Sequence, residues 1–281
     1  MAAKTLYISD LDGTLLNQNK EVSEYAKLII NAYIARGGQF SVATARTAAS
    51  TCKILSGLNI VVPVILMNGA VVYDFHEDKY IKTEIICKEI ANSILEVLNT
   101  HHISGFMYAI YKDKLMTYYE NLESKAMRDF HDERVQKYYK TFEQVSSFKE
   151  KLVDNGIIYF ALIDEFDQLL DVCNSLKNQH NIDMTLYKDI YEENLWYLEI
   201  YSIQASKFNA VNYLRKKGSY DRIIGFGDNH NDIPFLKACD EFYSVSNAVN
   251  ELKELATATI DSNINDGVVK FLLQKESIIL K

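Results

Sequence analysis

Tyr7-Ile8-Ser9-Asp10-Leu11-Asp12-Gly13-Thr14 is the most informative segment of the chain. The apolar run from Thr5 to Ser9 predicts a buried β-strand that leads directly into two aspartates. Because consecutive strand residues face opposite sides, Asp10 and Asp12 share a side if the extended geometry continues. Gly13 allows a sharp turn after them, and open α/β sheets bind ligands at the carboxyl ends of their strands. The segment therefore predicts a ligand site at the end of a buried strand.

Two carboxylates buried this close together are costly unless a cation or a shared proton compensates, which favours a functional site. A surface turn is one alternative, since Asp and Gly are common in turns. An EF-hand calcium loop is another, because Glu21 stands at the twelfth position counted from Asp10. That loop requires Gly at its sixth position, where this chain has Leu15, and a helix before it, where this chain has a predicted strand.

The composition indicates a soluble globular protein: of 281 residues, 48% are hydrophobic and 24% are charged. The net charge of -8, without a basic run, argues against nucleic acid and against anionic membranes as partners. No apolar stretch reaches the ~18 residues of a membrane span, and the segment before the first strand leaves no room for a signal peptide. The cysteines lack metal-binding spacing, so we expect reduced thiols and a cytoplasmic protein.

The order of the predicted elements indicates an α/β core with an insert. Strands and helices alternate at first, as in parallel sheets with right-handed crossovers. Near Ile81 the pattern changes to a helix, a hairpin, helical patterns that include Phe142 to Asp154, and further strands, which is typical of an α+β unit. The first pattern returns from Ser206. We predict core segments at residues 1–81 and 191–281 around a second domain at residues 82–190.

Further polar groups stand at the ends of other predicted core elements. Thr44 ends the second strand, Lys207 lies near a helix start, and Asp228, Asn231 and Asp232 follow a later strand. Each residue alone would be an ordinary turn or surface residue, but neighbouring parallel strands would bring all of them to one sheet edge. Carboxylates, a lysine and further hydrogen-bond donors at one place are what phosphoryl transfer needs. A carboxylate nucleophile repels a phosphate dianion, so a divalent cation must lie between them and further donors must hold the phosphoryl oxygens.

On these residues the chain resembles the haloacid dehalogenase superfamily, and within it the Cof-type phosphatases. The matching motifs, in order, are Asp-Leu-Asp-Gly-Thr-Leu at 10–15, Thr44 through Arg46, Asn68-Gly69-Ala70, Lys207, Gly227 through Asp232, Asn247-Ala248 and Asn265-Asp266-Gly267. The resemblance implies a Rossmann-like parallel-sheet core, an inserted α/β cap domain and Mg2+-dependent hydrolysis of phosphate esters.

The resemblance also implies roles for individual residues. Asp10 would be the nucleophile that forms an aspartyl-phosphate, and Asp12 the acid/base for the leaving alkoxide and the attacking water. Mg2+ would be held by Asp10, Asp228 and the backbone carbonyl of Asp12. The remaining roles are phosphate binding by Thr44, Ala45, Lys207 and Asn231, with support from Asn68 and Asp232.

Charge balance favours a metal, because four aspartates of this predicted site face one lysine and would repel each other without a divalent cation. We therefore expect a cytoplasmic, Mg2+-dependent phosphatase for small phosphorylated metabolites such as sugar phosphates, as a monomer or homodimer. Two alternatives remain open: a phosphomutase of the same fold, and a non-catalytic regulatory protein that binds a metabolite.

Overall fold

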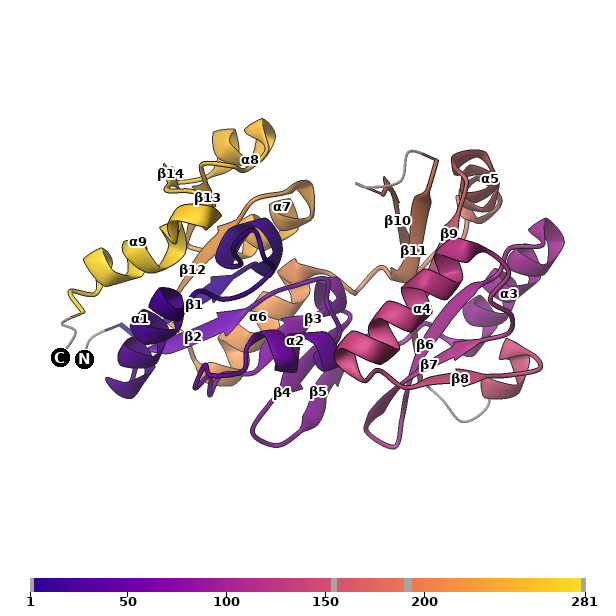
Figure 1. The fold of residues 1–281 in the computed structure, drawn as a ribbon, viewed down its shortest axis with the longest axis horizontal. Coiled ribbons are helices and arrows are strands. Elements are labelled where there is room, and N and C mark those ends of the chain that lie inside the picture. Colours follow the sequence, from indigo (N-terminus) through magenta and orange to yellow (C-terminus); the bar gives the residue numbers. More distant parts are fainter. Residues whose placement is uncertain (1–2, 153–155, 190–193, 279–281) are drawn as a thin grey trace. The chain divides into compact units, whose positions relative to one another are not determined.

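The computed structural model describes residues 3–152, 156–189 and 194–278, and the chain divides into two compact units (Figure 1). The unit called the core below combines Met1–Lys82 with Ala205–Lys281, and the unit called the insert is Thr83–Gln204. The predicted α/β architecture, a parallel-sheet core interrupted by a second α/β unit, is confirmed.

The core is built on a five-stranded parallel sheet that contains β1 (Thr5–Ser9). The strands β12 (Arg222–Gly227) and β2 (Gln39–Val42) flank β1, and β13 (Glu241–Val245) and β14 (Ala258–Ile260) continue the sheet beyond β12. Figure 1 shows the indigo β1 beside the orange β12, which come from opposite ends of the sequence. After its first residue β1 is buried throughout, as expected for an inner strand of a parallel sheet.

Helices connect the parallel strands of the core, as crossover connections require. The first of them, α1, begins where the Ser23 hydroxyl accepts a hydrogen bond from the N–H of Ala26 (2.9 Å). Its buried residues Ala26, Ile29, Ile30 and Tyr33 recur at helical spacing. The core helices are α1 (Glu24–Ala35), α2 (Ala48–Ile54), α6 (Lys207–Gly218), α7 (Ile233–Ala238), α8 (Asn250–Leu255) and α9 (Gly267–Lys275).

A small sheet extends the core beyond β2. It contains β3 (Val64–Leu66), β4 (Val71–Asp74) and β5 (Lys79–Thr83), and β3 and β4 are antiparallel. A single parallel bridge joins Ala43, just after β2, to Ile65 of β3. The loops that follow β2 and β3 are therefore adjacent.

The insert contains a six-stranded sheet in the order β10-β11-β9-β6-β7-β8. Its neighbouring strands are antiparallel except for the parallel pair β7 and β8. Its strands are β6 (Gly105–Tyr111), β7 (Lys114–Tyr119), β8 (Phe142–Gln144), β9 (Gly156–Asp164), β10 (Ile182–Lys188) and β11 (Trp196–Ser202), and its helices are α3 (Lys88–His101), α4 (Lys125–Tyr138) and α5 (Phe166–Leu176).

The two faces of the insert sheet differ in chemistry. Met107 of β6 belongs to an apolar cluster that also contains buried residues of α3 and α5. The residues before and after it, Phe106 and Tyr108, point to the other face, because side chains alternate along a strand. There Phe106 stacks on Phe130 of α4, with ring centroids 4.9 Å apart, and Tyr108 packs edge to face on Tyr159. One face of the sheet thus packs on α3 and α5, and the other, called the aromatic face below, carries the rings of Phe106, Tyr108 and Tyr159.

Two predictions need correction. The predicted boundary between residues 190 and 191 lies outside the described residues, and the units divide instead after Gln204, because β11 pairs with β9 and β10 of the insert. The helix predicted over Phe142–Asp154 is not present in its described part, which contains β8 and a single 3-10 turn at Phe148–Lys151; residues 153–155 lie outside the described ranges. The apolar residues that produce the helical spacing, Val145, Phe148 and Leu152, do lie in the insert's interior, but they stand after the edge strand and in or next to the 3-10 turn.

Within residues 3–152, 156–189 and 194–278, no helix combines the length and the apolar character needed to cross a membrane.

Candidate active site

Asp10 lies immediately after β1, at the carboxyl edge of the core sheet. Its N–H donates to the carbonyl of Phe226 (2.9 Å), which continues the ladder between β1 and β12 by one residue. The residue is only 5% exposed, so its carboxylate is held among neighbouring groups rather than in bulk water. The predicted strand is therefore present, and it places the Asp10 carboxylate in a buried position at the carboxyl edge of the sheet.

Lys207 supplies the cation that faces Asp10. It is the first residue of α6, where the hydroxyl of Ser206 caps the helix by accepting from the N–H of Asn209 (3.1 Å). The Lys207 ammonium is buried and donates to Oδ1 of Asp10 (2.6 Å) and to Oδ1 of Asp232 (2.7 Å). Burial opposes its charge, but the two carboxylates outweigh burial and raise the pKa of Lys207 above its ordinary value.

Asp232 has both carboxylate oxygens engaged within the loop after β12. Oδ1 accepts from Lys207, while Oδ2 accepts from the N–H groups of Asp228 (3.0 Å) and Asn229 (3.2 Å). Its exposed fraction is 0%, so these bonds satisfy a fully buried anion. Asp232 therefore fixes the loop and orients Lys207, which leaves it little capacity to bind a ligand itself.

Asp228 points toward the turn that follows Asp10. Its Oδ1 accepts a hydrogen bond from the Thr14 hydroxyl (3.1 Å). A β-carbon on Gly13 would stand 2.3 Å from Oδ2 of Asp228, and Gly13 has a φ of +78°, so glycine is required there for both space and backbone conformation. The two loops consequently approach closely enough to bring the Asp10 and Asp228 carboxylates to the same place.

These carboxylates form one acidic cluster. Oxygen atoms of Asp10, Asp228 and Asp232 all lie within 4.8 Å of one another. Burial, and then the negative charge of Asp232, raise the pKa of Asp228 to about 6. Lys207 balances only one of the three negative charges, and the donors are all oxygen atoms, the ligands preferred by hard divalent cations. The residues present therefore fit a bound divalent cation.

Asp12 lies outside the acidic cluster. Its carboxylate, with a half-exposed side chain, forms a two-pronged ion pair with Arg46, in which Nε and Nη2 each lie 2.6 Å from a carboxylate oxygen. Arg46 ends the motif that begins at Thr44, and the sequence alone predicts no role for it. A planar guanidinium gives such a pair a defined orientation, so Arg46 sets the direction of the Asp12 carboxylate.

The loop after β2 offers donors beside this pair. Thr44 is buried, and its hydroxyl oxygen accepts from the N–H of Arg46 (3.2 Å), which leaves the hydroxyl hydrogen free to donate. Ala45 is exposed, and within the described parts of the chain its N–H has no hydrogen-bond acceptor. Both groups are thus available to an oxygen-rich ligand.

The predicted amides Asn68 and Asn231 contact each other, since Nδ2 of Asn231 donates to Oδ1 of Asn68 (3.3 Å). The N–H of Asn68 also donates to the Thr44 carbonyl (3.1 Å), which joins the loops after β2 and β3. The next residue, Gly69, has a φ of +98° and lies against the α6 start: a β-carbon there would stand 2.2 Å from the Ser206 carbonyl oxygen. The structure thus brings the predicted site residues to one sheet edge. Asp12 lies at this edge too, but its carboxylate is paired with Arg46 and is not part of the acidic cluster.

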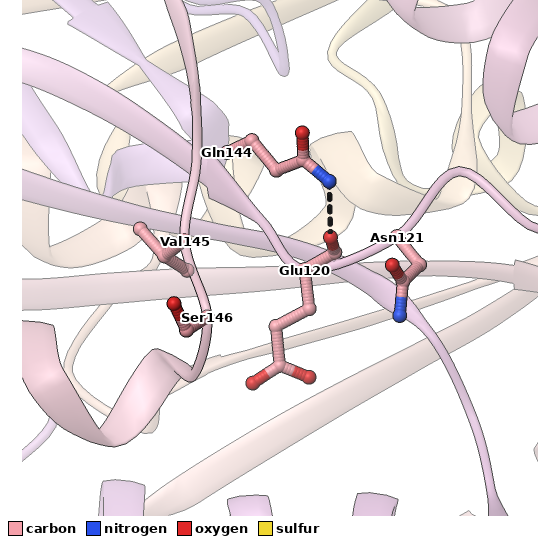
Figure 2. A pocket seen from close by; sticks show the side chains of 5 residues that line it. All are labelled: Glu120, Asn121, Gln144, Val145 and Ser146. Carbon is pink, nitrogen blue, oxygen red and sulfur yellow. Dashed lines mark hydrogen bonds between the residues drawn. The ribbon is translucent and has the colours of Figure 1, made fainter.

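A separate pocket of about 420 Å³ lies within the insert, as Figure 2 shows. Its lining residues are Glu120, Asn121, Gln144, Val145 and Ser146. The one carboxylate among them accepts from the N–H of Phe148 (2.7 Å), and the Glu120 carbonyl accepts from the Gln144 amide (3.0 Å). These residues stand at or just after the ends of β7 and β8, and none of them carries a positive charge.

The sequence is similar to those of known phosphatases over almost its whole length. A family model of haloacid dehalogenase-like hydrolases matches residues 7–272. The pyridoxal phosphate phosphatase of Escherichia coli (strain K12) is 26% identical over 271 residues, covering 94% of this chain and 95% of that protein. A 5-amino-6-(5-phospho-D-ribitylamino)uracil phosphatase of Bacillus subtilis (strain 168) is 21% identical over 280 residues, covering 96% of each.

Solved structures share the fold over nearly the whole chain. One from Thermotoga maritima has a TM-score of 0.77 at 25% identity and covers 99% of this chain and 98% of its own. A haloacid dehalogenase-like hydrolase from Bacteroides thetaiotaomicron has a TM-score of 0.79 at 18% identity and covers 96% of this chain and 99% of its own.

Proposed function

The chain belongs to the haloacid dehalogenase-like hydrolases, and from this membership we propose that it hydrolyses small phosphorylated metabolites with the help of Mg2+. It is a phosphatase of the Cof type, as the sequence analysis predicted. The two curated relatives described above are named for pyridoxal phosphate and for a phosphoribitylamino uracil. Both names denote small phosphate monoesters, which supports a substrate of that class for this chain.

One observation carries the proposed mechanism: the Lys207 ammonium is buried between the carboxylates of Asp10 and Asp232, at the end of β1. The Lys207 ammonium has three donors, and its bonds to two carboxylates from different loops fix it beside the Asp10 carboxylate. A phosphoryl group that approaches Asp10 would meet this fixed positive charge. Preorganised charge of this kind stabilises a phosphoryl-transfer transition state without reorganisation cost.

In the proposed first step, a carboxylate oxygen of Asp10 bonds to phosphorus while the ester P–O bond breaks. For this step Asp12 leaves its ion pair with Arg46 and carries a proton, which it gives to the leaving oxygen; the proton it takes from water in the second step restores this form. In the second step, a water oxygen bonds to phosphorus, the bond between Asp10 and phosphorus breaks, and Asp12 takes a proton from the water. Lys207 and the donors of Thr44 and Ala45 hold the phosphoryl oxygens throughout.

Asp10 and Asp228, with the backbone carbonyl of Asp12, would hold Mg2+, which when bound offsets the repulsion between these carboxylates and a phosphate dianion. Asn231 would add its amide to the phosphate-binding donors, while Asp232 keeps Lys207 in place and Asn68 supports Asn231 by accepting from its amide.

The test is phosphate release from p-nitrophenyl phosphate and from a panel of phosphorylated metabolites, with Mg2+ and with EDTA. Asp10→Asn changes the nucleophile with almost no change in shape, so we expect a folded protein without turnover. Asp261→Asn is the matched control, because Asp261 is an exposed core aspartate whose carboxylate pairs at the surface with Lys270 (3.3 Å). Its variant should retain wild-type activity.

Turnover by folded Asp10→Asn above a few per cent of wild type would rule out the nucleophile. Full activity in EDTA would rule out the metal. A phosphomutase would return the phosphate to another hydroxyl of a hexose phosphate instead of releasing it, and a regulatory protein would bind metabolites without turnover, so the same panel separates all three functions.

A further inference from the structure

The insert holds a buried cation that the proposed reaction does not use. Lys140 is 8% exposed, and its ammonium lies 4.1 Å from the ring centroid of Tyr108 and 4.9 Å from that of Phe142. The left-handed conformation of Tyr139 ends α4 and turns the chain back, and the N–H of Lys140 donates to the carbonyl of Arg134 (3.2 Å). The helix end thus fixes Lys140 over the aromatic face of the insert sheet.

This cation has no anionic partner in the described ranges of the chain. The acidic residue that follows Phe142, Glu143, accepts instead from Lys151 (2.7 Å). The charged group that acts on Lys140 is another cation, Arg134, and burial together with this neighbour lowers the pKa of Lys140 well below its ordinary value. Aromatic faces attract an ammonium but accept few of its three hydrogen bonds, so donors remain unused.

A second unused donor lies between the same two rings. Thr117 of β7 pairs directly with Tyr108 of β6 on one side and with Phe142 of β8 on the other. Residues that pair directly across strands share a face, so the Thr117 side chain lies on the face that Lys140 covers. The residue is 0% exposed, and its hydroxyl oxygen has no hydrogen-bond partner within residues 3–152, 156–189 and 194–278. Native proteins leave few such groups unpaired.

Lys140 and Thr117 can both donate hydrogen bonds and both lie beside the rings of Tyr108 and Phe142, and no described residue offers them a negatively charged acceptor. We propose that the insert contains an anion-binding site, at which a carboxylate or phosphate group of a small metabolite accepts hydrogen bonds from Lys140 and Thr117 between the rings of Tyr108 and Phe142. The charge-assisted bonds would supply the partner that the buried ammonium lacks. This site lies wholly within the insert and stands independently of the proposed phosphatase reaction.

The test follows Lys140 directly by NMR in the full chain labelled with [13Cε]-lysine. The Lys140 signal is assigned by its loss in Lys140→Met, which keeps the length and apolar packing of the side chain. Inorganic phosphate and acetate are titrated separately at constant ionic strength. We expect a saturable shift of the Lys140 signal, and a binding constant about tenfold weaker in Thr117→Val, which removes one hydrogen bond to a charged group.

The control signal is Lys112, an exposed lysine that also lies near an aromatic ring, with its ammonium 5.0 Å from the ring centroid of Tyr111. Saturation by phosphate alone identifies a phosphate ligand, by acetate alone a carboxylate ligand, and by both a general anion site; each supports the proposal. Linear shifts of Lys140 equal to those of Lys112 in both titrations would overturn it. If Lys140→Met does not fold, Lys140→Arg keeps the positive charge and also removes the lysine signal, so it provides the assignment and Thr117→Val provides the comparison. Turnover of p-nitrophenyl phosphate, measured on the same samples, reports the catalytic site separately.

Discussion

Gly69→Ala should damage activity from a position that touches no substrate. Gly69 follows β3 and lies against the start of α6, the helix whose first residue is Lys207. An added β-carbon would stand 2.2 Å from the carbonyl oxygen and 2.3 Å from the carbonyl carbon of Ser206. Both are backbone atoms, so no side-chain rotation can relieve the overlap.

The size of the effect can be estimated from two terms. Gly69 has a φ of +98°, and an L-residue held with a left-handed backbone costs roughly 1–2 kcal/mol. To bring the oxygen contact from 2.2 Å to 3.0 Å, the shortest distance that real β-carbons show, the loop and the α6 start must separate by at least 0.8 Å. A misplacement of about 1 Å at a catalytic group costs about 10²-fold in rate. We expect a loss of this order in kcat/KM.

Gly37→Ala is the matched control, because Gly37 also has a left-handed φ, +87°, but nothing lies within 4 Å of its added β-carbon. It should lose only the backbone term in urea unfolding and keep its kcat/KM. The Gly69 variant should unfold more easily than the control and turn over p-nitrophenyl phosphate far more slowly. Equal stability of the two variants, with activity of Gly69→Ala within threefold of wild type, would refute the steric argument.

Three further predictions concern titratable groups and the metal. Asp12→Asn should form phosphoenzyme from a sugar phosphate roughly 10²–10⁴-fold more slowly, but should lose less with p-nitrophenyl phosphate, whose leaving group needs little protonation. The phosphoenzyme should then accumulate, because its hydrolysis also needs Asp12; single-turnover quenching measures the rate of formation and the amount that accumulates. Equal losses with the two substrates and no accumulation would show that Asp12 is part of the site's scaffold and not its acid/base. Chelation should stop turnover, Mg2+ should restore it and Ca2+ should restore it poorly. Mg2+ should also raise the melting temperature of the wild-type protein, and this rise should be smaller in Asp228→Asn. An equal rise in the variant would contradict metal binding by Asp228. Burial raises the pKa of Glu199 despite hydrogen bonds from Tyr159 and Tyr187, so its contribution to stability is full below its unfolded pKa and is lost as pH rises through the folded pKa. Glu199→Gln should therefore gain stability relative to wild type as pH rises from about 5 to about 8, in urea unfolding; an unchanged pH dependence would show that Glu199 does not titrate differently on folding.

The site was predictable because its residues stand at the ends of strands. Asp10 and Asp228 follow two strands whose apolar runs are unmistakable, and parallel pairing of those strands is enough to bring the two carboxylates together. Lys207 follows a helix cap, and a cap fixes where the first helical residue points. The ends of two strands and the cap of one helix, all readable in the sequence, were therefore enough to predict that these three side chains meet.

Other features depend on contacts that the sequence does not reveal. The pairing of Arg46 with Asp12 needs the distance between two loops, and an Arg after Thr-Ala does not state which carboxylate it will meet. The short edge strand β8 resembles part of a helix in its apolar spacing, and only its parallel pairing with β7 makes it a strand. The second unit boundary was placed too early because β11 pairs with strands that precede it in the chain.

The core sheet joins two stretches of polypeptide that the ribosome delivers at different times. β1 emerges early, but its neighbour β12 is synthesised only after the whole of Thr83–Gln204. The insert is contiguous, so it can complete its own sheet during this interval, while one edge of the apolar β1 has no strand to pair with. Unpaired apolar edges are the surfaces that aggregate and that chaperones bind. Chaperone dependence during synthesis should therefore fall on the first 82 residues rather than on the insert, although the insert is the later product.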